Sequence, residues 1–139
     1  DVFHALDSLR LAEALEPVLA AAGRRWPIYA QVNAARDPNK GGVAPEAALG
    51  FLDALARFPH LDVVGWMAMA KEDDAGERAR PCFSTLRDVR DEAVRRGLGR
   101  VPPTGLSMGM SDELEAAIAA GSTLVRVGSA IFGARPPKT

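Results

Sequence analysis

The chain has 139 residues, of which 47% are hydrophobic and 25% charged, and a formal net charge of −1. That is the composition of an ordinary globular domain, and the balanced charge argues against non-specific nucleic-acid binding, which needs a basic surface. No apolar run reaches the roughly 18 residues of a membrane span and no signal peptide is visible, so we expect a cytoplasmic protein. A single cysteine, Cys82, excludes an internal disulfide and zinc sites of the CxxC type.

Short apolar runs alternate with helical patterns along the chain. Val2–Ala5 is the first apolar run, and the leucine periodicity of Ser8–Ala22 predicts a helix that stops at Gly23. Pro17 conflicts with this helix, because an interior proline should kink or break it.

The same alternation continues through the middle of the chain. We expect a strand over Pro27–Asn33, a loop over Ala34–Ala44, a helix over Pro45–Phe58 and a strand over Leu61–Met69. Pro45 suits the first turn of its helix, and the nearly continuous apolar run of the second strand is typical of a buried parallel strand.

The C-terminal part repeats the pattern twice more. After a charged loop at Lys71–Gly76, the sequence predicts a helix over Glu77–Arg96, a strand over Thr104–Met108, a helix over Ser111–Ala120 and a strand over Thr123–Val127. In the second helix, Asp112 and Glu115 stand at capping-box spacing.

Five strands alternating with helices predict an α/β fold with a parallel sheet in one domain spanning residues 1–139. Such a sheet can be open and doubly wound, or it can be part of a (β/α)₈ barrel, which usually needs about 250 residues. Length alone favours the open sheet.

Candidate site residues gather near the C-terminus. Ser111 is expected at a helix N-terminus, where unpaired N–H groups favour anions, and Arg126 lies on the following strand. Gly128 and Ser129 stand at the end of that strand, at the start of a short helix. Because adjacent parallel strands present their carboxyl ends to one crevice, these four residues predict an anion site of the phosphate-binding kind. Taken singly, each has a plainer explanation as a helix cap, a turn glycine or an ion-pair partner.

Longer motifs carry a family resemblance. The string SMGMS…GST-x-VR-x-G-x-x-IFG, together with HALDS, QVN…K-x-G and GWMAMA in the same order, covers essentially the whole chain. The sequence closely resembles the YggS/PROSC family of pyridoxal phosphate (PLP) homeostasis proteins, which are related to the N-terminal barrel domain of alanine racemases. The resemblance reverses the choice of fold and implies a partial (β/α)₈ barrel of the TIM type.

The resemblance also implies a cofactor and its contacts. Ser111 would bind the phosphate of PLP together with Gly128 and Ser129, and Arg126 would face the cofactor near its pyridine nitrogen or its phosphate. Asn33 and Met67, at the ends of their strands, are expected to line the same pocket. The implied role is a PLP carrier that turns over no substrate of its own. No metal is expected, since the isolated His4 and His60 lack zinc-ligand spacing.

The sequence departs from the family at its N-terminus. The first strands of the family barrel, with the lysine that binds PLP covalently, have no counterpart here, so we expect the C-terminal portion of a family member. The complete family fold is monomeric, whereas a portion with unpaired sheet edges is expected to be unstable or to self-associate. The three lysines are Lys40, Lys71 and Lys138. Only Lys71, after a strand, stands where a substitute lysine could act, and a solvated loop lysine is the simpler interpretation.

Two other functions stay open. A racemase-type enzyme needs two acid–base groups on opposite faces of the substrate carbon. In alanine racemases one of these is a tyrosine from a second domain, whereas the single tyrosine here, Tyr29, lies in a predicted strand. The other alternative is a truncated chain with no independent function.

Overall fold

A parallel sheet organises the molecule. The computed structural model describes residues 1–133. Within them the sheet has four strands, β1 (Phe3–Leu6), β2 (Trp26–Gln31), β3 (Leu61–Met67) and β4 (Gly105–Ser107), in the order β1-β2-β3-β4. The spatial order follows the chain order, so these strands lack the reversal that defines a doubly wound sheet. They are arranged as successive strands of a barrel wall.

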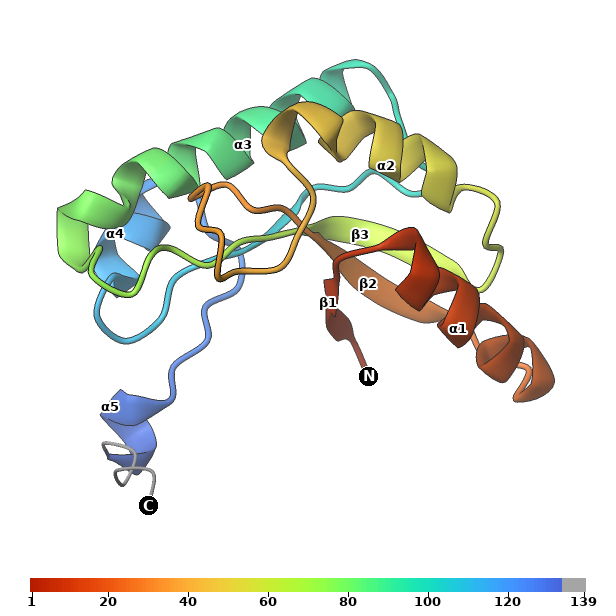
Figure 1. Ribbon diagram of the computed structural model, residues 1–139, viewed down its shortest axis with the longest axis horizontal. Coiled ribbons are helices and arrows are strands. Elements are labelled where there is room, and N and C mark those ends of the chain that lie inside the picture. The colour runs from red at the N-terminus through yellow and green to blue at the C-terminus, as the bar shows by residue number, and fades with distance from the viewer. Residues whose placement is uncertain (134–139) are drawn as a thin grey trace.

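Helices connect the strands. They are α1 (Leu9–Ala21), α2 (Ala48–Leu55) after the 3₁₀ turn η1 (Pro45–Ala47), α3 (Arg80–Arg95) after the 3₁₀ turn η2 (Gly76–Ala79), α4 (Leu114–Ala119) and α5 (Ser129–Phe132). Figure 1 shows α2 and α3 side by side over the sheet, and α5 at the end of an extended segment away from it. The order of strands and helices agrees with the sequence prediction as far as α4.

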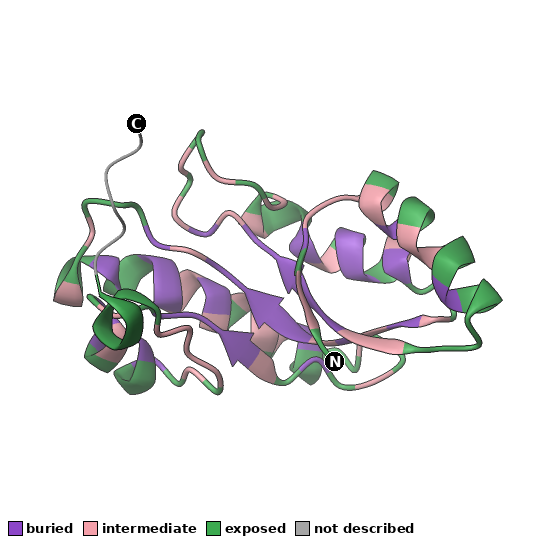
Figure 2. Ribbon diagram, turned by 90° about the horizontal axis from the view of Figure 1, so that it is seen from below, coloured by how far each residue is buried: buried purple, intermediate pink, exposed green. Residues whose placement is uncertain are grey.

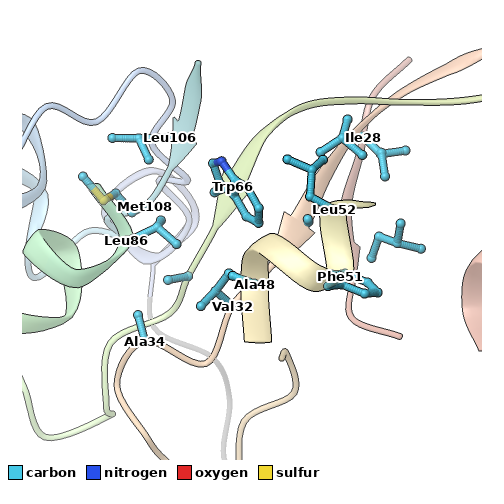
Figure 3. Packing of buried hydrophobic residues seen from close by; sticks show 14 of the residues in the cluster. Ile28, Val32, Ala34, Ala48, Phe51, Leu52, Trp66, Leu86, Leu106 and Met108 are labelled. Atoms are coloured by element: carbon cyan, nitrogen blue, oxygen red, sulfur yellow. The ribbon is translucent and has the colours of Figure 1, made fainter. Parts of the chain in front are cut away.

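The apolar core lies between the sheet and the helices. Trp66 of β3 and Phe83 of α3 are fully buried there, and Ile28 and Leu106 extend the same layer across the neighbouring strands. Figure 3 shows Leu52 of α2 directed at this layer from the helix side. At about 25 cal/mol per Å² of apolar surface, burial of such side chains is the main force that holds the helices on this face.

The opposite face of the sheet, called the inner face here, is more polar. Side chains alternate along a strand, so Gln31, Met67 and Ser107, which are paired in register, share one face. Tyr29 lies on this face two residues before Gln31, and neither Tyr29 nor Met67 belongs to the core cluster. Figure 2 views the molecule from below and shows buried residues along the strands and on the helix surfaces turned toward them.

Two predictions about this architecture are wrong in detail. The predicted fifth strand, Thr123–Val127, forms one isolated parallel bridge, Ser107 to Leu124. Backbone hydrogen bonds still hold it beside β4, but β4 has only three residues, which is too short to template a longer ladder. The helix α1 runs without a break through Pro17, whose ring is exposed.

The start of α4 also differs from prediction. It begins at Leu114 rather than Ser111, and Glu113 at its N-cap makes no side-chain cap hydrogen bond. The proposed capping box of Asp112 and Glu115 therefore does not form. This leaves the hydroxyl of Ser111 free for another partner.

Neither a membrane-spanning helix nor a metal-binding cluster is found in the part of the chain that the structure describes. No helix in residues 1–133 has the length and apolar character that crossing a membrane requires. Over the same residues, no group of three or more His, Cys, Asp or Glu side chains is placed to hold a metal ion.

Candidate functional site

A cleft of about 690 Å³ opens at the carboxyl ends of β3 and β4. Four of the predicted site residues line it: Ser111, Arg126, Gly128 and Ser129. The cleft volume falls within the roughly 300–1,000 Å³ of ordinary small-molecule sites. The carboxyl ends of parallel strands therefore meet here as the sequence analysis expects.

The phosphate-sized end of the cleft is built from two loops. Ser111 Oγ accepts a hydrogen bond from the backbone N–H of Ala130 at 3.3 Å, which joins the loop before α4 to the first turn of α5. Gly109, in the same loop, lets it pass close to α4: its φ is +96°, and an added Cβ would lie 2.4 Å from Cβ of Ala117. The Ser111 hydroxyl and the backbone N–H of Ala130 thus stand together, next to Ser129, which also lines the cleft.

Arg126 forms the other end. Its guanidinium donates to the Ser107 carbonyl at 3.0 Å, to Ser107 Oγ at 2.6 Å and to the Ala68 carbonyl at 3.2 Å. All three acceptors are uncharged, and no ion pair with Arg126 occurs among residues 1–133. Burial lowers its pKa from the usual value, whereas the nearby charge of Glu113 raises it. A half-buried cation held by neutral dipoles favours an anionic ligand.

Further charges surround the cleft. Lys40 and Lys71 line it, as do Asp112 and Glu113. Glu113 is 6% exposed, and burial raises the pKa of its carboxyl; the charge of Asp112 raises it too, while that of Arg126 lowers it. The cleft is therefore mixed in sign, and its basic groups come from three separate segments.

Asn33 and Met67 do not line this cleft, contrary to expectation. The Asn33 amide donates to the Asp37 carbonyl at 2.8 Å, and its Oδ1 accepts from the Asp37 N–H at 3.0 Å, so this side chain folds its own loop. Met67 is 4% exposed on the inner face. A position at the end of a strand does not by itself determine whether the side chain faces the cleft.

Lys40 is the cleft residue that the sequence analysis undervalued. Its glycine-rich loop turns back, so that Val43 pairs with Val32 at the end of β2. Gly42 sits in this return with a φ of +113°, where an added Cβ would lie 2.8 Å from the backbone nitrogen of Asn33. The sequence indicates this turn by the two glycines, Gly41 and Gly42, that directly follow Lys40.

The two histidines each contact another polar side chain. His60 Nδ1 lies 2.7 Å from Glu16 Oε1 and is half-buried. His4 Nδ1 lies 3.1 Å from Ser107 Oγ, and its ring stacks on Tyr29 with centroids 4.8 Å apart and an 8° angle between planes. Ser107 therefore links His4 to Arg126.

Known proteins share both the sequence and this architecture. PLP homeostasis proteins of Aquifex aeolicus and Pseudomonas aeruginosa are 34% and 36% identical over 96% and 95% of this chain. The chain spans 58% and 55% of the length of these curated relatives, that is, somewhat over half.

Solved structures agree. PipY of Synechococcus elongatus solved without PLP matches with a TM-score of 0.85 at 31% identity, over 96% of this chain and 61% of PipY. The form with PLP bound matches at 0.82 and 28% identity over the same shares. Alanine racemase of Clostridium difficile, at 15% identity and a TM-score of 0.75 over 96% of this chain and 34% of the racemase, shows the fold alone.

These likenesses identify the sheet as part of an alanine-racemase-like barrel. The family model described as "Alanine racemase, N-terminal domain" matches residues 1–136. The chain belongs to the alanine racemase N-terminal domain family.

Proposed function

We propose that this chain binds pyridoxal 5′-phosphate in the cleft and takes part in PLP homeostasis. The observation that carries the proposal is the meeting of Ser111 Oγ with the Ala130 N–H in the same cleft as Arg126, a cation without an ionised partner among residues 1–133. The names of the relatives and the PLP-bound form of PipY support it.

The residues fit the cofactor. Ser111, Ser129 and the backbone N–H groups after Gly128 suit a phosphate, which takes several hydrogen bonds at once. Arg126 would meet the pyridine ring or the phosphate, and its fixed positive charge next to the ring nitrogen would keep that nitrogen unprotonated. Bound PLP supplies an aldehyde that reacts with amines and an electron-withdrawing ring.

The positions of the lysines bear on whether PLP would be attached covalently or held by contacts alone. Lys40 and Lys71 both border the cleft but lie in loops, whereas the resemblance places the lysine that binds PLP covalently on a barrel strand. Lys138 lies outside the described residues. We propose that this chain holds PLP through its phosphate and ring contacts, without a covalent bond to any of its lysines.

The carrier function is favoured over racemisation. A racemase needs two acid–base groups on opposite sides of one carbon. Tyr29, the candidate for such a group within this chain, is packed under the His4 ring on the inner face and is not among the residues that line the cleft. We therefore propose a role without substrate turnover.

Titration of the chain with PLP, followed by absorbance, tests the phosphate site. Ser111→Ala and Arg126→Gln should each weaken binding by about tenfold or more, because each removes hydrogen bonds to a charged ligand. Ser84→Ala and Arg10→Gln are the matched controls, since neither residue lines the cleft. Inorganic phosphate should compete with PLP.

Borohydride reduction followed by peptide mapping tests the mode of attachment. The expected result is that no lysine carries the reduced cofactor. An adduct on Lys40 or Lys71 would overturn the non-covalent part of the proposal, and equal affinities for the site and control variants would overturn the site itself.

A further inference from the structure

A chain of polar contacts crosses the inner face of the sheet. It runs from His4 on β1 through Ser107 on β4 to Arg126, with distances of 3.1 Å and 2.6 Å between the successive polar atoms. Ser107 is fully buried. A hydroxyl with no access to solvent must satisfy its hydrogen bonds within this chain of contacts.

The direction of each hydrogen bond follows from the groups themselves. A guanidinium carries only donors, so Ser107 Oγ accepts from Arg126. The hydroxyl proton of Ser107 is then free to point at His4 Nδ1, which accepts it when the imidazole is neutral and carries its proton on Nε2. The neutral form of His4 thereby sets the orientation of Ser107.

The His4 ring is itself held in place. It stacks on Tyr29, and Tyr29 lies over Gly65 and Gly105, where an added Cβ would come within 2.6 Å and 2.7 Å of the tyrosine ring and hydroxyl. Two glycines on neighbouring strands thus let the aromatic pair lie close to the sheet. This packing fixes the position of Nδ1 relative to Ser107.

We propose that His4 is a positioning residue for cofactor binding, which acts through Ser107 to hold the guanidinium of Arg126 toward the cleft. The inference rests on the proposed function, since Arg126 is the group that would meet PLP. Protonation of His4 turns Nδ1 from an acceptor into a donor, and Ser107 Oγ would then receive two donors. A hydroxyl oxygen can accept from both, but its own proton would then have no acceptor in this chain of contacts. Ser107 would reorient, and Arg126 would be held by the carbonyl oxygens of Ser107 and Ala68 without the full contact to Ser107 Oγ.

The charges around His4 are few. From β2 it meets Tyr29, from β4 Ser107, and from the segment after the Leu124 bridge the cation Arg126; β3 contributes no titratable group to this row. Glu113 acts on Arg126 from the start of α4. Burial lowers the pKa of His4, and the positive charge of Arg126 lowers it further, so the neutral form prevails at neutral pH.

Two variants separate the hydrogen bond from the stacking. His4→Asn places an amide oxygen where Nδ1 stands and cannot titrate, whereas His4→Phe keeps an aromatic ring over Tyr29 and loses the acceptor. We expect His4→Asn to bind PLP as the unsubstituted chain does near pH 8, and His4→Phe to bind about three- to tenfold more weakly.

The pH dependence of PLP affinity distinguishes a positioning role of His4 from a merely structural one. Between pH about 8 and about 5, the PLP affinity of the unsubstituted chain should fall more than that of His4→Asn, because only the histidine can gain a proton, below its usual pKa of about 6.5. Titration of the PLP phosphate contributes equally to both chains and cancels in the comparison.

A second measurement uses the chain without PLP. The pKa of His4, followed by NMR with His60→Gln for assignment, should rise in Ser107→Ala, which removes the donor to the neutral ring, and in Arg126→Met, which removes a like charge. An unchanged pKa in both variants overturns the contact chain.

The outcomes distinguish this inference from the function on which it rests. If the unsubstituted chain does not bind PLP, the proposed function fails and this inference fails with it. If PLP binds but His4→Phe matches the unsubstituted chain in affinity and pH profile, only the role of His4 is wrong.

Discussion

At the scale of single residues, the inner face depends on two positions that exclude a side chain. An added Cβ at Gly65 would lie 2.4 Å from the Gly105 carbonyl oxygen and 2.6 Å from the Tyr29 ring. The backbone atom cannot move away without disturbing the pairing of β3 with β4. Glycine is required here for close packing rather than for a turn.

Gly65→Ala should therefore destabilise the chain by about 1–3 kcal/mol, the usual cost of overpacking. Gly50→Ala is the matched control: Gly50 lies in α2 with no atom within 4 Å of an added Cβ, and the same change there should stabilise by about 0.5–1 kcal/mol. Urea unfolding of both variants measures the difference. Equal effects would show that Gly65 has no packing role.

At the scale of elements, helices with a strong apolar period were predictable and the last strand was not. The period that buries Phe83 and Leu86 in α3 is a local property of the sequence. Thr123–Val127 contains residues that favour strands. Whether it forms a hydrogen-bonded ladder depends on the length of β4, its neighbour in the sheet, and this is not a local property of the segment. Ser111 lines the cleft, but its hydroxyl contacts α5 instead of capping α4.

Pro17 offers a test within one element. The residue removes a backbone donor from the interior of α1, and its ring is exposed and packs no core. Pro17→Ala should stabilise the chain by about 2 kcal/mol, the helix gain being reduced by a more flexible unfolded state. Pro45→Ala, at the first position of η1 where proline is favoured, should bring no gain. Thermal unfolding of the two variants decides, and a larger gain for Pro45→Ala would contradict this account.

At the scale of the whole molecule, contacts between distant segments were beyond sequence reasoning. His4 and Ser107 are 103 residues apart, and Lys40 reaches the cleft only because its loop returns to β2. The four residues Ser111, Arg126, Gly128 and Ser129 were predictable because they follow two neighbouring strands within one short stretch. Asn33 and Met67 were also predicted at strand ends, but their side chains do not line the cleft.

The pH dependence of the free energy of unfolding is a property of the whole molecule. Just below pH about 6.5 we expect His4 to make the largest contribution to it. Its folded pKa is lowered, so its contribution is present above the unfolded value of about 6.5 and is lost as pH falls through the folded pKa. Asp62, whose pKa the Arg25 hydrogen bond lowers, loses its contribution only below its own usual value near 3.8. The free energy of unfolding should thus fall as pH drops below about 6.5.

The comparison with His4→Asn isolates this effect. Glu113, with a raised pKa, acts in the opposite direction over part of the same range but contributes equally to both chains. Urea unfolding across the pH series should give a flatter curve for His4→Asn. Two parallel curves would place the pH dependence elsewhere.

The parallel arrangement of the strands also separates the two ends of the molecule. The carboxyl ends carry the cleft, whereas the turn between α1 and β2 at the other end contains Ala22, which is exposed and has an ordinary right-handed backbone conformation. A six-residue strand such as β2 puts about 20 Å between these ends. A fluorophore or an immobilisation linker attached to a cysteine introduced by Ala22→Cys would therefore face away from the cleft and leave its mouth open to ligand in a surface-based assay.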